Sequence, residues 1–250
     1  MDFYDNIADS YAQLTGAAAR QPSAQRFVRE LTQRFNVTSA IDAACGTGLF
    51  AIELARCGVT VVGSDISGGM LQSAPGAAEA AGVDMKLCSW LEAPMQDLTG
   101  LVSGDRDAVL CMGNSIPHLL TDDALKSAIQ GFFKLLAPGG VVAIHLLNYS
   151  RVLSQGERIV GITRHGAKEF VRFYDFNRDL IDFNILEIDC DADGRCSHRL
   201  STTPLRPYLH IELSDALAAG GFGQIETFGD LQFGSFDPET SDTLLLIATA

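Results

Sequence analysis

Residues 40–67, AIDAACGTGLFAIELARCGVTVVGSDIS, decide how this chain of 250 residues folds. Apolar runs at 39–44 and 59–64 have the length and composition of buried strands, and a helical pattern at 48–57 lies between them. A short turn with two glycines joins the first strand to the helix. The order strand, glycine turn, helix and strand predicts one unit of a parallel α/β sheet, with the turn at the edge where such sheets bind ligands.

The alternation of strand and helix continues beyond this unit. Further buried strands are expected at 107–112 and 140–147, helices are expected at 68–81 and 122–136, and a weaker strand candidate lies at 84–88. Such an alternation is typical of a doubly wound, mostly parallel sheet. We therefore expect an α/β fold of the Rossmann-like type, with seven strands in the main sheet.

The pattern changes after residue 150, where strand-like segments follow one another with no helix between them. They are ERIVGITR, KEFVRFYDF, DLIDFNILEID and SHRLSTTPLRPY, at 157–164, 168–176, 179–189 and 197–208. Successive strands predict an antiparallel, β-rich insert, which we expect to cover the ligand site as a lid. A helix near 211–220 and two strands, near 224–229 and 243–249, are expected to complete the main domain.

These patterns divide the chain into three parts. Residues 26–153 and 208–250 are expected to form the Rossmann-like domain, and residues 154–207 the lid insert. Residues 1–25 are expected to form an N-terminal segment that covers the cofactor. Within that segment, GAAARQPSAQ at 16–25 has the composition of a mobile join between an N-terminal helix and the main fold.

Charge and composition argue against several kinds of partner. The net charge of −13 disfavours a nucleic-acid backbone, which binds Lys and Arg by counterion release, and disfavours an anionic membrane surface. No apolar run approaches the ~20 residues of a membrane span, and the first residues lack the features of a signal peptide, so we expect a cytoplasmic protein. The six cysteines include no CxxC pair, so reduced core thiols are expected and no metal site is expected.

Two features of residues 40–67 indicate the class of ligand. Gly46, Gly48 and Ala51 give a GxGxxA pattern, which is a weak match to a dinucleotide fingerprint. Asp65 ends the second strand, 19 residues after Gly46, where a carboxylate accepts hydrogen bonds from both ribose hydroxyls. NAD and an adenosyl sulfonium compound satisfy both features, so the spacing leaves the two ligands open.

Six motifs follow one another in the first three fifths of the chain. They are YDNIADSY (4–11), DAACGTG (42–48), SDISGGML (64–71), CSWLEAP (88–94), DAVLCMGNSIPHLL (107–120) and LLAPGGVVAIHLLNYSRVL (135–153). In this order they resemble the class I S-adenosylmethionine-dependent methyltransferases. The pieces ACGTG, SW, CMGNSIPHL and NY look most like glycine N-methyltransferase and the bacterial glycine and sarcosine methyltransferases. The resemblance implies S-adenosyl-L-methionine as cofactor and in-line methyl transfer to a small-molecule amine or hydroxyl acceptor.

The resemblance also implies which residues bind the cofactor. Asp65 would hold the ribose, Ser89 and Trp90 would complete the adenine pocket, and Arg20 or Tyr11 would meet the carboxylate of the methionine portion. The whole implied set is Tyr4, Tyr11, Arg20, Ala44, Gly46, Gly48, Asp65, Ile66, Met70, Ser89, Trp90, Met112 and Ser115.

The acceptor is expected at the carboxyl end of the fourth strand. Asn114 and His118 follow that strand, and together with Tyr11 they are the predicted catalytic residues. Tyr4, Tyr11 or His118 would relay the proton that an amine acceptor loses. The predicted substrate-binding residues are Asn114, His118, Asn148, Tyr149, Arg172 and Tyr174.

One departure from the resembled enzymes bears on the acceptor. Leu147 stands where those enzymes have the arginine that binds an amino-acid carboxylate. A buried carboxylate loses several kcal/mol without its guanidinium partner, so glycine would need Arg151, Arg172 or Arg206 as a substitute.

Three alternatives to a general small-molecule methyltransferase stay open at this stage. The first is a glycine or sarcosine N-methyltransferase proper, and the second is a non-catalytic S-adenosylmethionine-binding regulator. The third, an NAD-dependent oxidoreductase, is disfavoured because the chain shows no Tyr-x-x-x-Lys pair. Association into a homo-oligomer is also left open.

Overall fold

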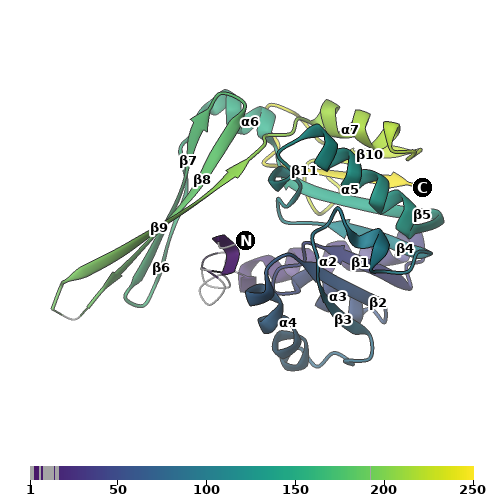
Figure 1. The fold of residues 1–250 in the computed structure, drawn as a ribbon, viewed down its shortest axis with the longest axis horizontal. Coiled ribbons are helices and arrows are strands. Elements are labelled where there is room, and N and C mark those ends of the chain that lie inside the picture. Colours follow the sequence, from purple (N-terminus) through teal and green to yellow (C-terminus); the bar gives the residue numbers. More distant parts are fainter. Residues whose placement is uncertain (1–2, 6, 8–13, 15–16, 192) are drawn as a thin grey trace.

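The computed structural model describes residues 3–5, 7, 14, 17–191 and 193–250. Its main sheet has seven strands in the order β10-β11-β5-β4-β1-β2-β3 (Figure 1). Six of them run in the same direction, and β11 runs the other way, pairing antiparallel with both β5 and β10. Their bounds are β1 Ser39–Ala43, β2 Thr60–Asp65, β3 Cys88–Glu92, β4 Arg106–Cys111, β5 Leu136–Leu147, β10 Ile225–Phe228 and β11 Thr243–Thr249. The predicted doubly wound, mostly parallel sheet is confirmed.

Helices cover both faces of this sheet, so the core has two halves. Helices α2 (Ala17–Phe35) and α3 (Leu49–Arg56) pack on one face, where Phe27, Leu31 and Leu54 are fully buried. Helices α5 (Asp122–Leu135) and α7 (His210–Ala219) pack on the other. Further helical elements are α4 Gly68–Ala80, α6 Tyr149–Gln155, and the 3-10 turns η1 Leu98–Gly100 and η2 Ile116–His118.

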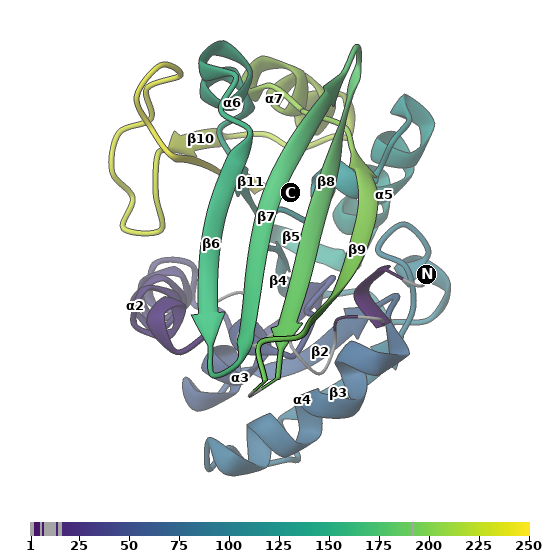
Figure 2. The same ribbon diagram turned by 90° about the vertical axis from the view of Figure 1, so that its left-hand side faces the viewer.

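A second, antiparallel sheet of four strands is inserted between α6 and α7. Its strands are β6 Ile159–His165, β7 Lys168–Asn177, β8 Leu180–Cys190 and β9 Cys196–Leu205, paired in that order. Figure 2 shows them side by side in front of the main sheet. The β-rich insert predicted from the sequence is therefore present.

Four sequence expectations are wrong in detail. GAAARQPSAQ is not a loose join, because α2 begins at Ala17 and runs through it. The third strand lies at Cys88–Glu92 and not at 84–88. Helix α6 was not expected. Cys190 and Cys196 form a disulfide because the register of β8 and β9 places them opposite each other, while Cys45, Cys57, Cys88 and Cys111 are free.

The glycine turn is held against Trp90, which explains why position 48 requires glycine. Gly48 has φ +88°, and a Cβ added to it would lie 2.7 Å from the Trp90 ring. Gly63 of β2 is equally close, since its added Cβ would meet that ring at 2.6 Å. The indole therefore fills the space that the two missing side chains leave beneath the turn.

We expect Gly48→Ala to lower the free energy of unfolding by about 1–3 kcal/mol through backbone strain alone. The clash of the new Cβ with the Trp90 ring should lower it further. Gly82→Ala is the matched control, since Gly82 also has positive φ (+70°) but open space around its Cβ. Urea unfolding of both variants measures the difference. Equal destabilisation of the two variants would show that the contact with Trp90 contributes nothing.

Candidate active site

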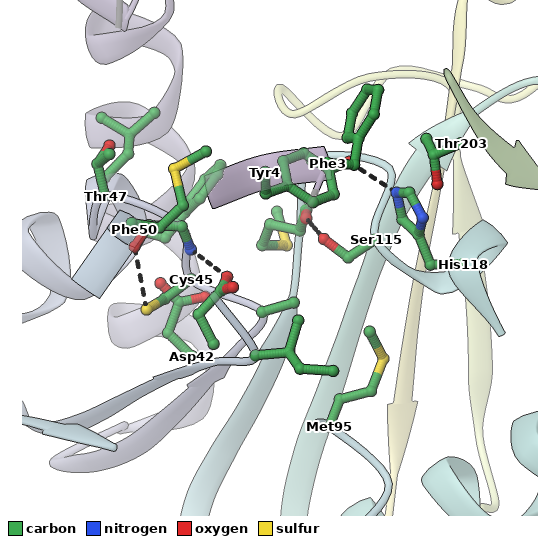
Figure 3. A pocket seen from close by; sticks show the side chains of 18 of the residues that line it. Phe3, Tyr4, Asp42, Cys45, Thr47, Phe50, Met95, Ser115, His118 and Thr203 are labelled. Carbon is green, nitrogen blue, oxygen red and sulfur yellow. Dashed lines mark hydrogen bonds between the residues drawn. The ribbon is translucent and has the colours of Figure 1, made fainter. Parts of the chain in front are cut away.

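Two adjoining cavities lie at the carboxyl ends of the parallel strands, beneath the four-stranded sheet. The first has a volume of about 270 Å³ and the second about 250 Å³. Tyr4, Arg20, Gly113 and His118 line both, so these four residues mark the boundary between them. Thr203 brings β9 to the first cavity (Figure 3), and strands β6 to β9 supply much of the second.

The glycine turn forms one wall of the first cavity through Ala44, Gly46 and Thr47, whereas Gly48, also expected to bind the cofactor, does not line it. Ala44, Gly46 and Gly48 all have positive φ, at 59°, 56° and 88°. The Gly46 N–H donates to Asp65 Oδ2 at 2.7 Å, and the Ser67 N–H donates to Asp65 Oδ1 at 2.9 Å. Asp65 therefore ties the turn after β1 to the start of α4. Burial raises the pKa of Asp65, and the hydrogen bonds from Ser67 and Gly46 oppose that rise.

A second buried carboxyl group, Asp42 of β1, lies in the same wall. It accepts a hydrogen bond from the Ala51 N–H at 2.9 Å, and burial raises its pKa to about 7. Sequence reasoning did not assign Asp42, although an acidic residue at the end of a strand just before a glycine turn was visible. Two carboxyl groups in one wall favour a ligand that carries positive charge.

Apolar side chains also line the first cavity. Ile66 is 42% exposed and lines the cavity, so a flat ring placed against it would cover apolar surface that is otherwise left to water. Met70 and Met112 also line it and are 1% and 3% exposed. Met95 lines this cavity as well (Figure 3) and was not predicted.

Ser89 and Trp90 do not line the first cavity, contrary to the sequence expectation. The expected strand at 84–88 would have placed them just beyond its carboxyl end. Because β3 lies at Cys88–Glu92, they fall in its first half instead, and Met95 comes just beyond the end. Trp90 packs against the glycine turn, and the Ser89 hydroxyl donates a long hydrogen bond of 3.5 Å to the Val61 carbonyl.

The start of the chain lies against this cavity. Asp5 accepts hydrogen bonds from the Ser67 hydroxyl at 2.5 Å and from the Gly69 N–H at 3.1 Å, and these bonds lower its pKa. Phe3 and Tyr4 line the cavity beside it. Tyr11, a predicted cofactor-binding and catalytic residue, lies outside the described residues.

Tyr4 and His118 meet where the two cavities join. The Tyr4 hydroxyl is 2.7 Å from His118 Nε2, a hydrogen bond drawn in Figure 3. His118 stands on the 3-10 turn after β4, and burial lowers its pKa to about 4. The ring is therefore neutral near pH 7. Ser115, predicted as a cofactor residue, also lines the first cavity, where its hydroxyl donates to the Met112 carbonyl at 2.8 Å.

The low pKa of His118 predicts a pH dependence of stability. Between pH 7 and pH 5 the unfolded chain protonates this histidine, whose ordinary pKa is 6.5, whereas the folded protein, with a pKa of about 4, does not. His118 therefore contributes stability that is present above pH 6.5 and is lost as the pH falls towards 4. Urea unfolding at pH 7 and pH 5 should show a smaller loss for His118→Phe than for the wild type. The same loss in both would contradict the buried, neutral ring.

Asn114, Asn148 and Tyr149 have structural contacts that the sequence did not reveal. Asn114 Oδ1 accepts from the Leu147 N–H at 3.1 Å, and its Nδ2 donates to the Tyr149 hydroxyl at 3.0 Å. Asn148 donates to three backbone carbonyls, those of Asp237, Pro238 and Ser241. Asn148 and Tyr149 are buried and line neither cavity. Asn114 lines the second cavity with its amide already engaged.

The second cavity is mainly apolar. Leu147, Phe183 and Ile185 line it together with Val160 and Leu205. Arg172 and Tyr174 of β7, both predicted to bind substrate, line it as well. Burial raises the pKa of Tyr174 to about 12, so this phenol stays protonated. His145 of β5 also lines the cavity and was not predicted.

Of the three arginines considered as substitutes at Leu147, only Arg172 lines a cavity. Arg151 forms a salt bridge with Asp242, and Arg206 forms salt bridges with Asp122 and Glu212. Neither Arg151 nor Arg206 lines either cavity.

Comparisons with known proteins agree with this geometry. Residues 40–140 match the model of a family described as a methyltransferase domain. The glycine/sarcosine N-methyltransferase of Halorhodospira halochloris is 26% identical over 241 residues, which cover 95% of this chain and 86% of that enzyme.

Two solved structures share the fold over nearly the whole chain. An S-adenosylmethionine-dependent methyltransferase from Clostridium acetobutylicum has a TM-score of 0.81 at 17% identity, covering 98% of each chain. The CcbJ methyltransferase from Streptomyces caelestis also has a TM-score of 0.81, at 22% identity, covering 98% of this chain and 96% of that one.

The described part of the chain has no helix with the length and apolar character that crossing a membrane requires. The matched domain contains the glycine turn, both buried carboxyl groups and His118. Residues 40–140 match a methyltransferase domain, the chain is similar over 95% of its length to a glycine/sarcosine N-methyltransferase, and it shares its fold with a solved S-adenosylmethionine-dependent methyltransferase.

Proposed function

We propose that the enzyme methylates an uncharged amine or a hydroxyl group of a small molecule held in the second cavity. The observation that carries this proposal is the Tyr4–His118 hydrogen bond of 2.7 Å at the boundary of the two cavities. A polar pair at that boundary is where an acceptor's nucleophile would meet the cofactor's methyl group.

The residues of the first cavity fit the cofactor. When bound, S-adenosylmethionine supplies a methyl group on a positively charged sulfur. Asp65 would accept the ribose hydroxyls, and Ile66 with Met95 would pack against the adenine. Asp42 would face the positive charge, and Arg20, at the boundary, would bind the carboxylate of the methionine portion. Positioning and exclusion of water by such walls can supply most of the catalysis in an in-line displacement.

His118 is better suited to orient the acceptor than to deprotonate it. With a pKa of about 4, its ring is too weak a base to hold the proton of an ordinary alkylammonium group. The neutral Tyr4–His118 pair can instead accept a hydrogen bond from an N–H or O–H of the acceptor and turn its lone pair towards the methyl group. The amine would therefore enter already uncharged, and kcat/KM would rise with pH up to the amine's own pKa.

The four-stranded sheet and the start of the chain are proposed as the covers of the site. Residues 154–207 would act as the substrate lid, because β7 and β8 line the second cavity. Residues 1–25 would cover the cofactor, because Asp5 is bonded to the start of α4. The net charge of −13 supports a dissolved small molecule over nucleic acid or a membrane surface, and we infer a cytoplasmic enzyme.

A glycine or sarcosine N-methyltransferase proper is the second candidate, supported by the relative from Halorhodospira halochloris. Leu147 and the apolar walls of the second cavity favour an acceptor with a larger apolar body. Mass spectrometry of products formed from S-adenosylmethionine and a panel of glycine, sarcosine, larger amino acids and amino sugars distinguishes the two. Methylation of glycine or sarcosine alone would contradict our preference, and tight cofactor binding without any turnover would favour the non-catalytic regulator.

A further inference from the structure

One side-chain atom of a residue at the second cavity lacks a hydrogen-bond partner among the described residues. His145 Nδ1 is closed off from solvent, and no described residue forms a hydrogen bond with it. The same residue lines the second cavity. Burial and the nearby charge of Arg20 lower its pKa to about 4, so the ring is neutral near pH 7. A neutral imidazole offers one donor and one acceptor.

The backbone of β5 fixes this ring in place. The His145 carbonyl accepts from the Asn114 N–H at 3.0 Å, and the residue pairs with Leu245 of β11. Its neighbours Ile144 and Leu146 point into the core half that contains α5 and α7. Because side chains alternate along a strand, His145 points to the other face, towards Arg20 of α2.

A buried polar atom without a partner costs about 1–3 kcal/mol, and an apolar side chain of similar shape would avoid that cost. A hydrogen bond to a bound molecule would remove it. Arg20 makes this corner of the cavity electropositive, so the neutral ring donates most favourably to an atom with negative charge or partial negative charge. An oxygen atom of the acceptor has that character.

We propose that His145 binds a hydroxyl or carboxylate oxygen of the methyl acceptor, so that the acceptor carries this oxygen in addition to the group that is methylated. The inference rests on the proposed function of the second cavity. His118 would face the reacting nitrogen or oxygen, His145 the second oxygen, and Leu147 and Phe183 would contact the apolar part between them. His145 is then a residue that determines specificity.

Three compounds that share an amine and one apolar body test this arrangement. 3-Methylbutylamine has only these two parts, leucinol adds a hydroxymethyl group, and leucine adds a carboxylate. Calorimetric titration into protein saturated with S-adenosylhomocysteine measures binding without requiring turnover. We expect leucinol, leucine or both to bind at least about tenfold more tightly than 3-methylbutylamine, which corresponds to one hydrogen bond. The compound preferred identifies the oxygen as hydroxyl or carboxylate.

His145→Phe keeps an aromatic ring and removes its nitrogens, so it should reduce that preference to within about threefold. His145→Asn should retain part of it, and His165→Asn, at the exposed end of β6, should retain all of it. In the wild type, the preferred compound should also shift the ring nitrogen NMR signals of His145, assigned by their loss in His145→Asn. This second measurement does not depend on the folding of His145→Phe.

Equal binding of the three compounds to the wild type, or a preference that His145→Phe leaves unchanged, would overturn the inference. So would a lack of binding by all three in protein that still binds S-adenosylhomocysteine. Each of these results leaves the cofactor site and methyl transfer to other acceptors standing. Failure of the proposed function would appear differently, as a lack of turnover on the whole acceptor panel.

Discussion

Asp65→Ala should weaken binding of S-adenosylmethionine by at least about 100-fold, or about 3 kcal/mol. The carboxylate accepts the Gly46 and Ser67 N–H groups, so its loss leaves two backbone donors without their partner and frees the glycine turn. It also removes the group proposed to bind the ribose. Calorimetric titration measures the change in dissociation constant.

The matched control for this substitution is Asp107→Ala. Asp107 is also a carboxylate with several hydrogen bonds, to Thr38 and Ser39, but it lies at the amino end of β4 and lines neither cavity. The Asp107→Ala variant should bind the cofactor as the wild type does. If Asp65→Ala bound normally, or if both variants lost binding equally, Asp65 would have no specific role at the ligand.

His118→Phe should lower kcat by about 100-fold, which is the order of loss expected when a reacting group is misplaced by about 1 Å. The substitution removes the nitrogen that is bonded to Tyr4 and leaves a ring of similar size. Tyr4→Phe should lower kcat in the same direction. Because neither change touches the glycine turn, the dissociation constant of S-adenosylhomocysteine should stay within about threefold of the wild type in both.

His210→Phe is the control, since His210 begins α7 and lines neither cavity. Steady-state kinetics with the acceptor identified by the panel gives kcat and KM separately. Unchanged kcat in His118→Phe would contradict the orienting role. A parallel loss of cofactor affinity would show instead that the Tyr4–His118 pair supports the first cavity.

The order of helices and strands could be predicted because each of them has a local sequence pattern. Strands at 39–44 and 59–64, and the helix between them, follow from apolar runs and a glycine turn, and the structure places them at Ser39–Ala43, Thr60–Asp65 and Leu49–Arg56. The four strands of the insert follow from successive strand-like segments with no helix between them. Ala44, Gly46, Asp65 and Met70, which were expected to bind the cofactor, all line the first cavity, and their role there stays a prediction.

The site residues that the sequence did not predict depend on contacts between segments that are distant in the chain. The position of β3 along the sequence decides which residue reaches the first cavity. The strand lies four residues later than expected, so Met95 lines the cavity and Ser89 and Trp90 do not. Asn148 was predicted to bind the substrate, but in the structure its amide donates to three backbone carbonyls of the loop around Pro238. His145 could not be singled out, because only the fold shows that its Nδ1 has no hydrogen-bond partner among the described residues.

The most direct test of the central claim is calorimetric titration of the purified protein with S-adenosylmethionine, S-adenosylhomocysteine and NAD. We predict micromolar or tighter binding of the two adenosyl compounds and no binding of NAD, because the two buried carboxyl groups of the first cavity, Asp42 and Asp65, disfavour the negatively charged pyrophosphate of NAD. Binding of NAD with no binding of the adenosyl compounds would contradict it.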